Sequence, residues 1–237
     1  MKNPARNKII QFKNIVYLVF ILLLICGCIS CASKGQFNKG DVTTDGLTVM
    51  KSTRFTEAQI KNGVNWSEYT KYLITPVEVS FRKNWKRDHN RGQRGISGQV
   101  TDKDMARIRQ SMGKLVYEEF DKALQEESGL TKVNEPDSST LLFKPVIINL
   151  DVYAPDIPSA SMSNTYIRQA GRATLFLEIH DAVSGELLAR WVDTREDPDR
   201  VYTEWATRIT NETRAKHIVS NWSRRLVEGL DNLRAIN

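Results

Sequence analysis

The chain has 237 residues, with 34 lysines and arginines against 28 aspartates and glutamates, and a formal net charge of +6. Its three cysteines, Cys26, Cys28 and Cys31, lie near the N-terminus. This placement excludes structural disulfides and cysteine-based metal sites from the rest of the chain. The remaining length suits one domain with its own hydrophobic core.

The N-terminal segment has the three-part layout of a secretory signal. Four basic residues precede an apolar run that covers fifteen residues from Ile15 to Ile29. A membrane-spanning helix needs about 20 residues, so we expect a cleaved signal rather than a transmembrane anchor. The end of the run, Leu24-Ile25-Cys26-Gly27-Cys28, resembles a bacterial lipobox. The resemblance implies cleavage before Cys28 and attachment of acyl chains such as palmitate to Cys28, while Cys31 fits the pattern less well.

Cleavage changes the charge of the chain. Removal of residues 1–27 takes away four basic side chains and no acid, which leaves 30 basic against 28 acidic residues, a net charge of +2. The mature chain therefore lacks the excess of basic residues that is typical of nucleic-acid-binding proteins. We expect residues 1–27 to form the lipoprotein signal peptide, residues 28–46 the lipidated N-terminus and a flexible polar tether, and residues 47–237 a single globular domain.

The first two elements beyond the tether are a strand and a long helix. Residues 72–81 predict a strand, because apolar and polar side chains alternate after Pro76, and this proline indicates an edge position or a bulge. Apolar residues recur at three- and four-residue steps over residues 101–125, which predicts a helix. Thr101 and Asp104 resemble a capping box at its start.

Three further strands and a second helix complete the predicted domain. Residues 141–153 form a strand interrupted by Pro145, and residues 173–181 alternate most clearly. A turn then leads into an antiparallel return strand over residues 187–192. Residues 211–234 have the pattern of an amphipathic helix. The order β-α-β-β-β-α predicts an α+β fold, a mostly antiparallel sheet with helices on one face.

The predicted hairpin carries a family resemblance. Residues 180–189 read His-Asp-Ala-Val-Ser-Gly-Glu-Leu-Leu-Ala and resemble the D-A-x-[ST]-G-E-L hairpin of an uncharacterised bacterial lipoprotein family, domain of unknown function 3313. Asp45-Gly46-Leu47 and Pro76-Val77-Glu78-Val79 are also similar to its pattern, so the likeness covers about residues 45–234. The motif is structural, because Gly185 can take a positive φ and Asp181 can accept from turn amides. The resemblance implies an envelope location and a fold, and it supplies no activity.

One charge cluster stands out, at residues 82–94. Six basic side chains lie there with one aspartate and one tryptophan: Arg82, Lys83, Lys86, Arg87, Arg91 and Arg94. A basic segment near an anionic membrane gains about 1 kcal/mol per lysine or arginine, and together with acyl chains it forms a two-signal anchor. We therefore predict contact with anionic headgroups or an acidic partner. The alternative is a solvated loop between strand and helix.

No catalytic motif is recognisable in the sequence, so we expect a non-enzymatic protein without catalytic, cofactor-binding or metal-binding residues. Glu178 and His180 share a strand face, as two metal ligands could, but no third ligand can be assigned. Asp193 and Asp197 lie in a stretch rich in both charges, which indicates a balanced surface loop. Trp222 is expected in the core, on the last helix.

These observations favour a membrane-anchored envelope lipoprotein that binds a protein or an envelope polymer, and no nucleic acid. Ile29 replaces the aspartate that retains lipoproteins at the inner membrane in enteric-type sorting, so we expect the inner leaflet of the outer membrane, with the domain facing the periplasm. An unpaired sheet edge, such as the strand at Pro76, is a candidate docking surface. The alternative is a lipid or small-ligand binding module with a cavity between sheet and helices.

Overall fold

Three long strands form the centre of the fold. The computed structural model describes residues 40–50, 54–91, 99–153, 166–167, 171–197, 204–205 and 208–235. Strands β6 (Thr140–Val152), β8 (Gly171–Asp181) and β9 (Leu187–Glu196) pair antiparallel, with β8 in the middle. Their clear two-residue alternation explains why these strands were predictable from the sequence.

Shorter strands extend the sheet on both sides. Next to β9 lie β2 (Glu57–Ile60) and then β1 (Thr48–Met50), both antiparallel to their neighbours. On the far side of β6, β3 (Lys71–Ile74) and β4 (Glu78–Phe81) pair with it in parallel, and β5 (Thr131–Lys132) pairs with β3. The described chain thus forms an eight-stranded, mostly antiparallel sheet. β7 (Tyr166–Ile167) and β10 (Glu204–Trp205) form a separate pair.

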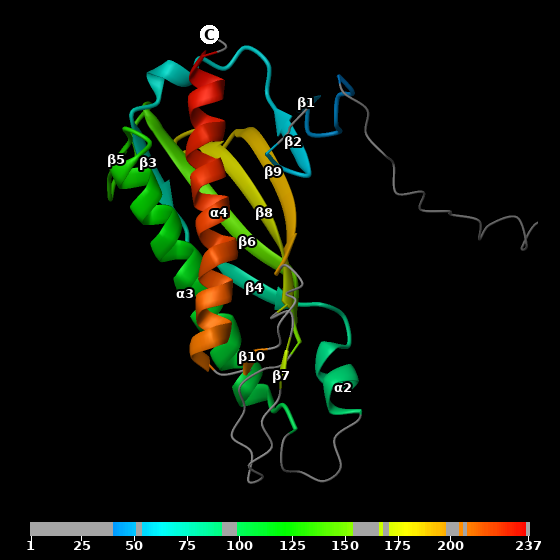
Figure 1. The fold of residues 1–237 in the computed structure, drawn as a ribbon. Coiled ribbons are helices and arrows are strands. Elements are labelled where there is room, and N and C mark those ends of the chain that lie inside the picture. Colours follow the sequence, from blue (N-terminus) through cyan, green and yellow to red (C-terminus); the bar gives the residue numbers. More distant parts are fainter. Residues whose placement is uncertain are drawn as a thin grey trace, which may run out of the picture. The chain divides into compact units, whose positions relative to one another are not determined.

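Two long helices, α3 (Asp102–Glu126) and α4 (Arg208–Ala235), lie side by side along one face of the sheet (Figure 1). The Ser220 hydroxyl of α4 donates to Glu119 of α3 at 2.8 Å. The predicted capping box begins α3, since the Asp104 N–H donates to the Thr101 hydroxyl and the Asp104 carboxylate accepts from the Thr101 N–H. The short helices are η1 (Trp66–Glu68) and α2 (Trp85–Asn90).

The core lies between the sheet and these two long helices. It is built from large apolar side chains that are buried on the inner face of the sheet, on α3 and on α4: Phe143, Ile147, Leu175, Leu177, Ile179, Trp191, Val116, Phe120, Leu124, Trp222, Leu226 and Leu230. Trp222 has no exposed surface, which confirms its predicted core position. Large apolar side chains from the sheet and from both helices therefore form one continuous core.

The α+β class is confirmed, but the observed order contains more elements than the predicted β-α-β-β-β-α. The strand predicted over residues 72–81 is divided into β3 and β4, with Pro76 in the break. The strand predicted to be interrupted at Pro145 is continuous, because Pro145 lies opposite this break. Its missing N–H therefore falls where β6 has no described partner on that side.

None of the described helices is both long enough and apolar enough to cross a membrane. Residues 1–39, which include the predicted signal peptide, Cys28 and most of the tether, lie outside the described residues.

Candidate functional site

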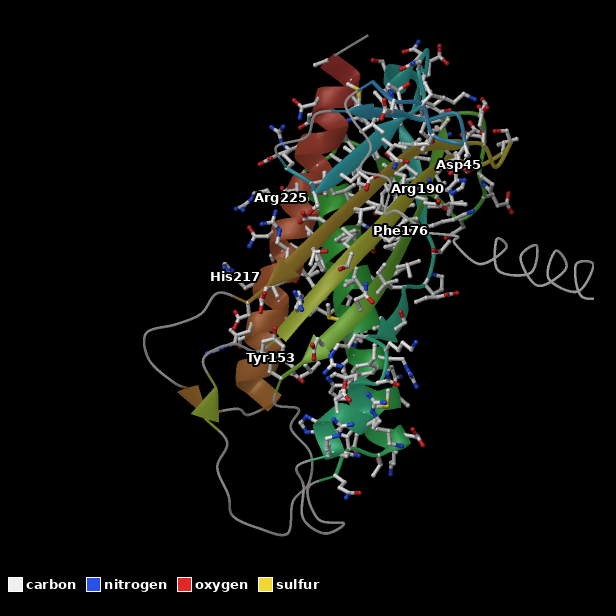
Figure 2. All side chains as sticks on the ribbon, turned by 90° about the vertical axis from the view of Figure 1, so that its right-hand side faces the viewer. Asp45, Tyr153, Phe176, Arg190, His217 and Arg225 are labelled. Atoms are coloured by element: carbon white, nitrogen blue, oxygen red, sulfur yellow. The ribbon has the colours of Figure 1, made fainter. Side chains whose placement is uncertain are left out.

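The face of the sheet opposite α3 and α4, here called the open face, is covered by no described helix (Figure 2). Strand pairing places Val146 of β6, Phe176 of β8 and Val192 of β9 side by side on it. All three side chains are half-buried. A fixed row of apolar side chains therefore crosses the middle of this face, and it is here called the apolar row.

Arg190 is the centre of a polar network beside the apolar row. Its Nη1 donates to Asp45 Oδ2 at 2.7 Å, and its Nε and Nη2 donate to Glu178 Oε1 at 3.0 and 2.8 Å. The guanidinium carbon lies 5.6 Å from the centre of the Phe176 ring, which is cation–π geometry. Two carboxylates thus hold one cation over one aromatic ring. Figure 2 shows Asp45, Arg190 and Phe176 near one another.

Glu178 stays ionised in this network. Burial raises the pKa of Glu178, but the hydrogen bonds from Arg190 and His180 outweigh it, so the pKa is lowered overall. The His180 ring lies 3.2 Å from Glu178 Oε2 through Nε2 and 3.0 Å from the Gly185 carbonyl oxygen through Nδ1. The shared strand face predicted for Glu178 and His180 is therefore present. Among the described residues, no group of three or more histidines, cysteines or carboxylates could hold a metal ion.

The hairpin between β8 and β9 is held by its aspartate. Asp181 Oδ1 accepts from the Val183 N–H at 3.0 Å and the Ser184 N–H at 2.7 Å, while the Tyr69 hydroxyl donates to Oδ2 at 2.9 Å. The Ser184 N–H is the main reason why the pKa of Asp181 is lowered. Gly185 has φ of +73°, a conformation that favours glycine. The structural role predicted for the motif is confirmed.

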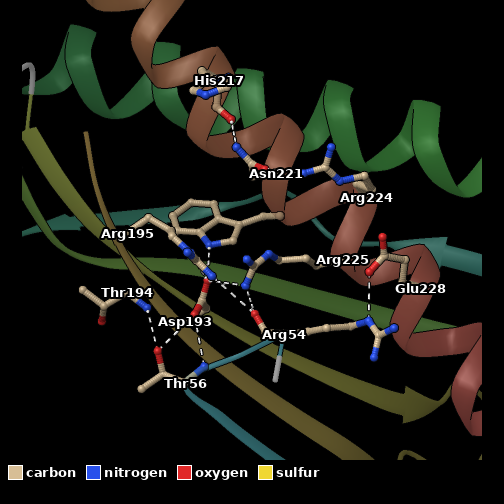
Figure 3. A network of polar contacts seen from close by, with 11 residues as sticks. Arg54, Thr56, Asp193, Thr194, Arg195, His217, Asn221, Arg224, Arg225 and Glu228 are labelled. Atoms are coloured by element: carbon tan, nitrogen blue, oxygen red, sulfur yellow. Dashed lines mark hydrogen bonds and ion pairs between the residues drawn. The ribbon is translucent and has the colours of Figure 1, made fainter. Parts of the chain in front are cut away.

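A second polar site lies on the helix side, where β9 meets α4 (Figure 3). Asp193 is only 2 % exposed, and its carboxylate accepts four hydrogen bonds. Oδ1 accepts from the N–H and the hydroxyl of Thr56 at 3.1 and 3.0 Å. Oδ2 accepts from Arg195 Nε at 2.6 Å and from the Trp222 indole N–H at 3.0 Å. Full hydrogen bonding of this kind makes a buried charge tolerable.

Three arginines surround this carboxylate, and Arg54, Arg195 and Arg225 are here called the arginine cluster. Arg225 Nη1 lies 3.9 Å from Asp193 Oδ2 and donates to the main-chain oxygen of Arg54. Arg195 Nη2 donates to the same oxygen at 3.4 Å. Arg54 Nε donates to Glu228 of α4 at 2.8 Å. The arginine cluster therefore joins the segment before β2, the end of β9 and α4.

The surface-loop prediction for Asp193 and Asp197 is wrong, since these residues are 2 % and 1 % exposed. Asp197 pairs with Arg214 of α4 at 2.7 Å. Apart from Arg195, which is two residues away, the partners of Asp193 come from distant segments, and Asp197 pairs across to α4, which local charge patterning does not show. A signal was nevertheless present, because Asp193 follows the apolar Trp191 by two residues and strand alternation places both on the core face.

Comparison with known proteins settles the family. The family model described as "Protein of unknown function (DUF3313)" matches residues 48–226. The chain belongs to DUF3313. The match contains the hairpin, the apolar row and the arginine cluster, and it confirms the resemblance seen in the hairpin motif. No match was found among curated proteins.

Solved structures similar to this DUF3313 chain include a point variant of the PelC dodecamer from Paraburkholderia phytofirmans, with 7 % identity, a TM-score of 0.32, and coverage of 70 % of this chain and 95 % of that one. A PDZ domain protein from Parabacteroides distasonis has 11 % identity and a TM-score of 0.35, over 69 % of this chain and 33 % of that one. A proposed lipoprotein from Caulobacter crescentus has 12 % identity and a TM-score of 0.32, over 72 % and 93 %. These scores are too low to support a shared function.

The predicted basic segment of the DUF3313 domain carries several internal ion pairs. Arg82 pairs with Asp151 at 2.7 Å and with Asp88 at 2.8 Å. Arg87 also pairs with Asp88, at 2.9 Å, and Lys86 pairs with Asp102 at 2.8 Å. These carboxylates neutralise half of the six predicted cations.

The other three basic residues of this segment are not part of these ion pairs. Lys83 and Arg91 are exposed and make no ion pair with any described side chain, whereas Arg94 lies outside the described residues. Asn90 exchanges two hydrogen bonds with the main chain of Val100, at 2.8 and 3.0 Å. The two ends of the basic segment's loop are therefore fixed beside each other, and its contact with anionic headgroups stays a prediction.

Sequence reasoning missed Arg190 and the arginine cluster. Arg190 and Asp45 were not distinguishable from ordinary surface charges, because the carboxylates that Arg190 bonds, Asp45 and Glu178, lie in other segments of the chain. The DUF3313 fold brings them together through register, which a single sequence does not encode locally.

Proposed function

We propose that this DUF3313 protein is a lipid-anchored lipoprotein of the cell envelope that acts by binding a protein, and that the open face is its docking surface. The lipobox-like sequence supports an anchor at Cys28. Ile29 after that cysteine supports the inner leaflet of the outer membrane, with the domain facing the periplasm. The short polar tether that follows Cys28 would keep the domain close to the membrane, since the chain is already hydrogen-bonded to the domain from Gly40 onward.

The observation that carries this proposal is the apolar row. Val146, Phe176 and Val192 continue across the sheet to Glu78 of β4 at one end and Glu57 of β2 at the other. Apolar side chains in the centre with charges at the rim form the usual anatomy of a protein interface. Because both ends are acidic, the partner that fits best is a polypeptide segment with apolar side chains flanked by lysine or arginine.

The network around Arg190 supports a fixed contact surface. Arginine and aromatic residues are enriched among the residues that dominate binding energy, and Arg190 is already seated over Phe176 before any partner arrives. Such preorganisation lowers the entropic cost of association. The lowered pKa of Glu178 also supports a binding role. A carboxylate that stays ionised near neutral pH suits a permanent ion pair and not a general acid.

Site-directed photocrosslinking in intact cells tests the docking surface. A benzophenone amino acid replaces Val192 or Val146 on the open face, and Lys114 on the outer side of α3, where the side chain is 72 % exposed, serves as the control position. We expect one protein to crosslink from both open-face positions and not from position 114.

A pair of variants makes the test specific. Phe176→Ala is expected to reduce the crosslink at least tenfold, whereas Val183→Ala, at a 63 % exposed apolar side chain in the hairpin turn, is expected to leave it unchanged. Equal crosslinking in wild type and Phe176→Ala, or the same product from position 114, would contradict the assigned surface.

A further inference from the structure

Among the described residues, the three guanidinium groups of the arginine cluster face two carboxylates, Asp193 and Glu228. Arg54 pairs with Glu228 at 2.8 Å. Within the described part of the chain, Asp193 is then the carboxylate that Arg195 and Arg225 share, at 2.6 and 3.9 Å. Two guanidinium groups thus converge on one carboxylate, and the longer of the two contacts leaves Arg225 with the weaker pairing.

Both guanidinium-bearing side chains reach solvent, whereas the carboxylate does not. The exposed fraction is 34 % for the Arg195 side chain, 23 % for Arg225 and 3 % for Asp193. The main-chain oxygen of Arg54 accepts from both guanidinium groups and so fixes them beside each other (Figure 3). The surface therefore presents two preorganised cations, with their counter-charge buried behind them.

The electrostatics of Arg225 agree with this geometry. Burial lowers the pKa of Arg225, and the like charge of Arg195 is the next cause, ahead of the opposing attraction of Asp193. Arg224, which lowers it, and Glu228, which raises it, have smaller effects. An anion placed against Arg195 and Arg225 would offset these unfavourable interactions.

We propose that the arginine cluster is a binding site for an oxyanion of the phosphate class, held between Arg195 and Arg225. Planar guanidinium groups bind phosphate oxygens in pairs of parallel hydrogen bonds, which lysine cannot do. The phosphate group belongs either to a free phosphate or to the headgroup of an anionic lipid. The site differs from both the basic segment and the open face, so this proposal does not rest on the proposed function.

The indole N–H of Trp222 reports on this site directly. It donates to Asp193 Oδ2 at 3.0 Å, whereas the Trp85 indole N–H donates to the Val152 carbonyl oxygen at 3.1 Å and serves as the internal control. The full chain, labelled with ¹⁵N-tryptophan and held in detergent, is titrated with sodium phosphate at constant ionic strength. We expect the Trp222 NMR signal to move and saturate while the Trp85 signal stays in place.

A matched pair of variants assigns the shift to the cluster. Arg225→Gln is expected to weaken phosphate binding at least tenfold. Arg224→Gln removes the same charge from the adjacent position, where the side chain donates to Asn221 at 2.5 Å, and should bind phosphate within about twofold of wild type. An unchanged Trp85 signal shows that each variant is folded. Wild-type affinity in Arg225→Gln, or an equal Trp222 shift with sodium chloride, would overturn the proposal.

Nanodiscs distinguish the two sources of the phosphate group. The same chain is placed in phosphatidylcholine discs with and without phosphatidylglycerol, in phosphate-free buffer. A Trp222 shift that requires phosphatidylglycerol assigns the site to lipid headgroups, and a shift with free phosphate alone assigns it to a soluble ligand. Absence of a Trp222 shift in both arms refutes the site.

Discussion

Asp193 connects the two layers of the domain, since its carboxylate accepts from Thr56 next to β2, Arg195 of β9 and Trp222 of α4. Both carboxylate oxygens act only as acceptors, and each accepts two of the four hydrogen bonds. An asparagine has the same shape but presents an amide N–H₂ to one pair of these donors. The loss of negative charge also leaves Arg195 and Arg225 without their shared counter-charge.

We therefore predict that Asp193→Asn lowers the free energy of unfolding by about 3 kcal/mol. Urea denaturation followed by tryptophan fluorescence measures this loss. Glu196→Gln is the matched control on the same strand, because Glu196 is exposed and, within the described part of the chain, its side chain accepts from the Tyr153 hydroxyl alone, at 2.6 Å. The control should lose less than about 1 kcal/mol. Similar losses in the two variants would show that burial of Asp193 is not the cause.

The lowered pKa of Asp181 makes the free energy of unfolding depend on pH. Hydrogen bonds from Ser184, Tyr69 and Val183 lower the pKa of this carboxyl. A group whose pKa is lower in the folded state contributes stability that is fully present above its unfolded pKa of about 4, and that is lost as the pH falls through the folded value. The difference in unfolding free energy between wild type and Asp181→Asn should be constant near neutral pH and shrink below about pH 4. Urea midpoints measured from pH 7 to pH 2 test this, and a difference that does not change with pH would contradict it.

At the scale of elements, α3 passes close to the backbone of the sheet layer at Gly113. A Cβ atom at this position would lie 2.9 Å from the main-chain oxygen of Val77, in the break between β3 and β4. That oxygen belongs to the backbone and cannot move aside as a flexible side chain could.

Gly113→Ala is therefore expected to lower the free energy of unfolding by about 1–3 kcal/mol, although alanine in a helix is intrinsically favoured by about 1 kcal/mol. Thermal unfolding compares it with Ser111→Ala, an exposed position on the same helix, which should be neutral or slightly stabilising. A more stable Gly113→Ala protein would mean that α3 can shift away from the sheet at little cost.

The elements that the sequence predicted are those with one unbroken periodicity. The helix expected at residues 101–125 is α3, Asp102–Glu126, and the strand expected at residues 173–181 is β8, Gly171–Asp181. β1, β2 and β5 were missed, because strands of two to four residues are too short for alternation to be distinguished from loop sequence. Pro76 correctly indicated an irregularity in the strand. Only the pairing with β6 shows that the irregularity divides one predicted strand into two.

The candidate sites were less predictable than the elements, for a physical reason. Arg190 meets Asp45, and Asp193 meets Trp222, only through sheet register and helix packing. Single-sequence reasoning could identify the hairpin at Asp181, where donors and acceptor lie within three residues. It had no means of pairing charges that lie far apart along the chain.

The whole molecule offers two chemically different surfaces. The open face combines the apolar row with Glu57 and Glu78 at its ends. The arginine cluster, on the other side of the sheet, sets three arginines against two carboxylates among the described residues. Since cleavage before Cys28 would bring the chain from +6 to +2, these local surfaces, rather than a general basic character, would govern recognition in the mature protein.

The anchor at Cys28 decides whether this charge argument applies. We expect the membrane fraction of expressing cells to contain a species that begins at Cys28 and is heavier than the bare chain by the mass of its acyl chains. Intact-mass spectrometry measures it, and the species should be absent in Cys28→Ala but present in Cys31→Ala, the matched control for the neighbouring cysteine. If the full precursor mass persists in all three proteins, the chain keeps its four N-terminal basic residues and its +6 charge. The basic segment and the arginine cluster would then act together in a cationic protein. Net charge, and not the two local surfaces, would govern recognition.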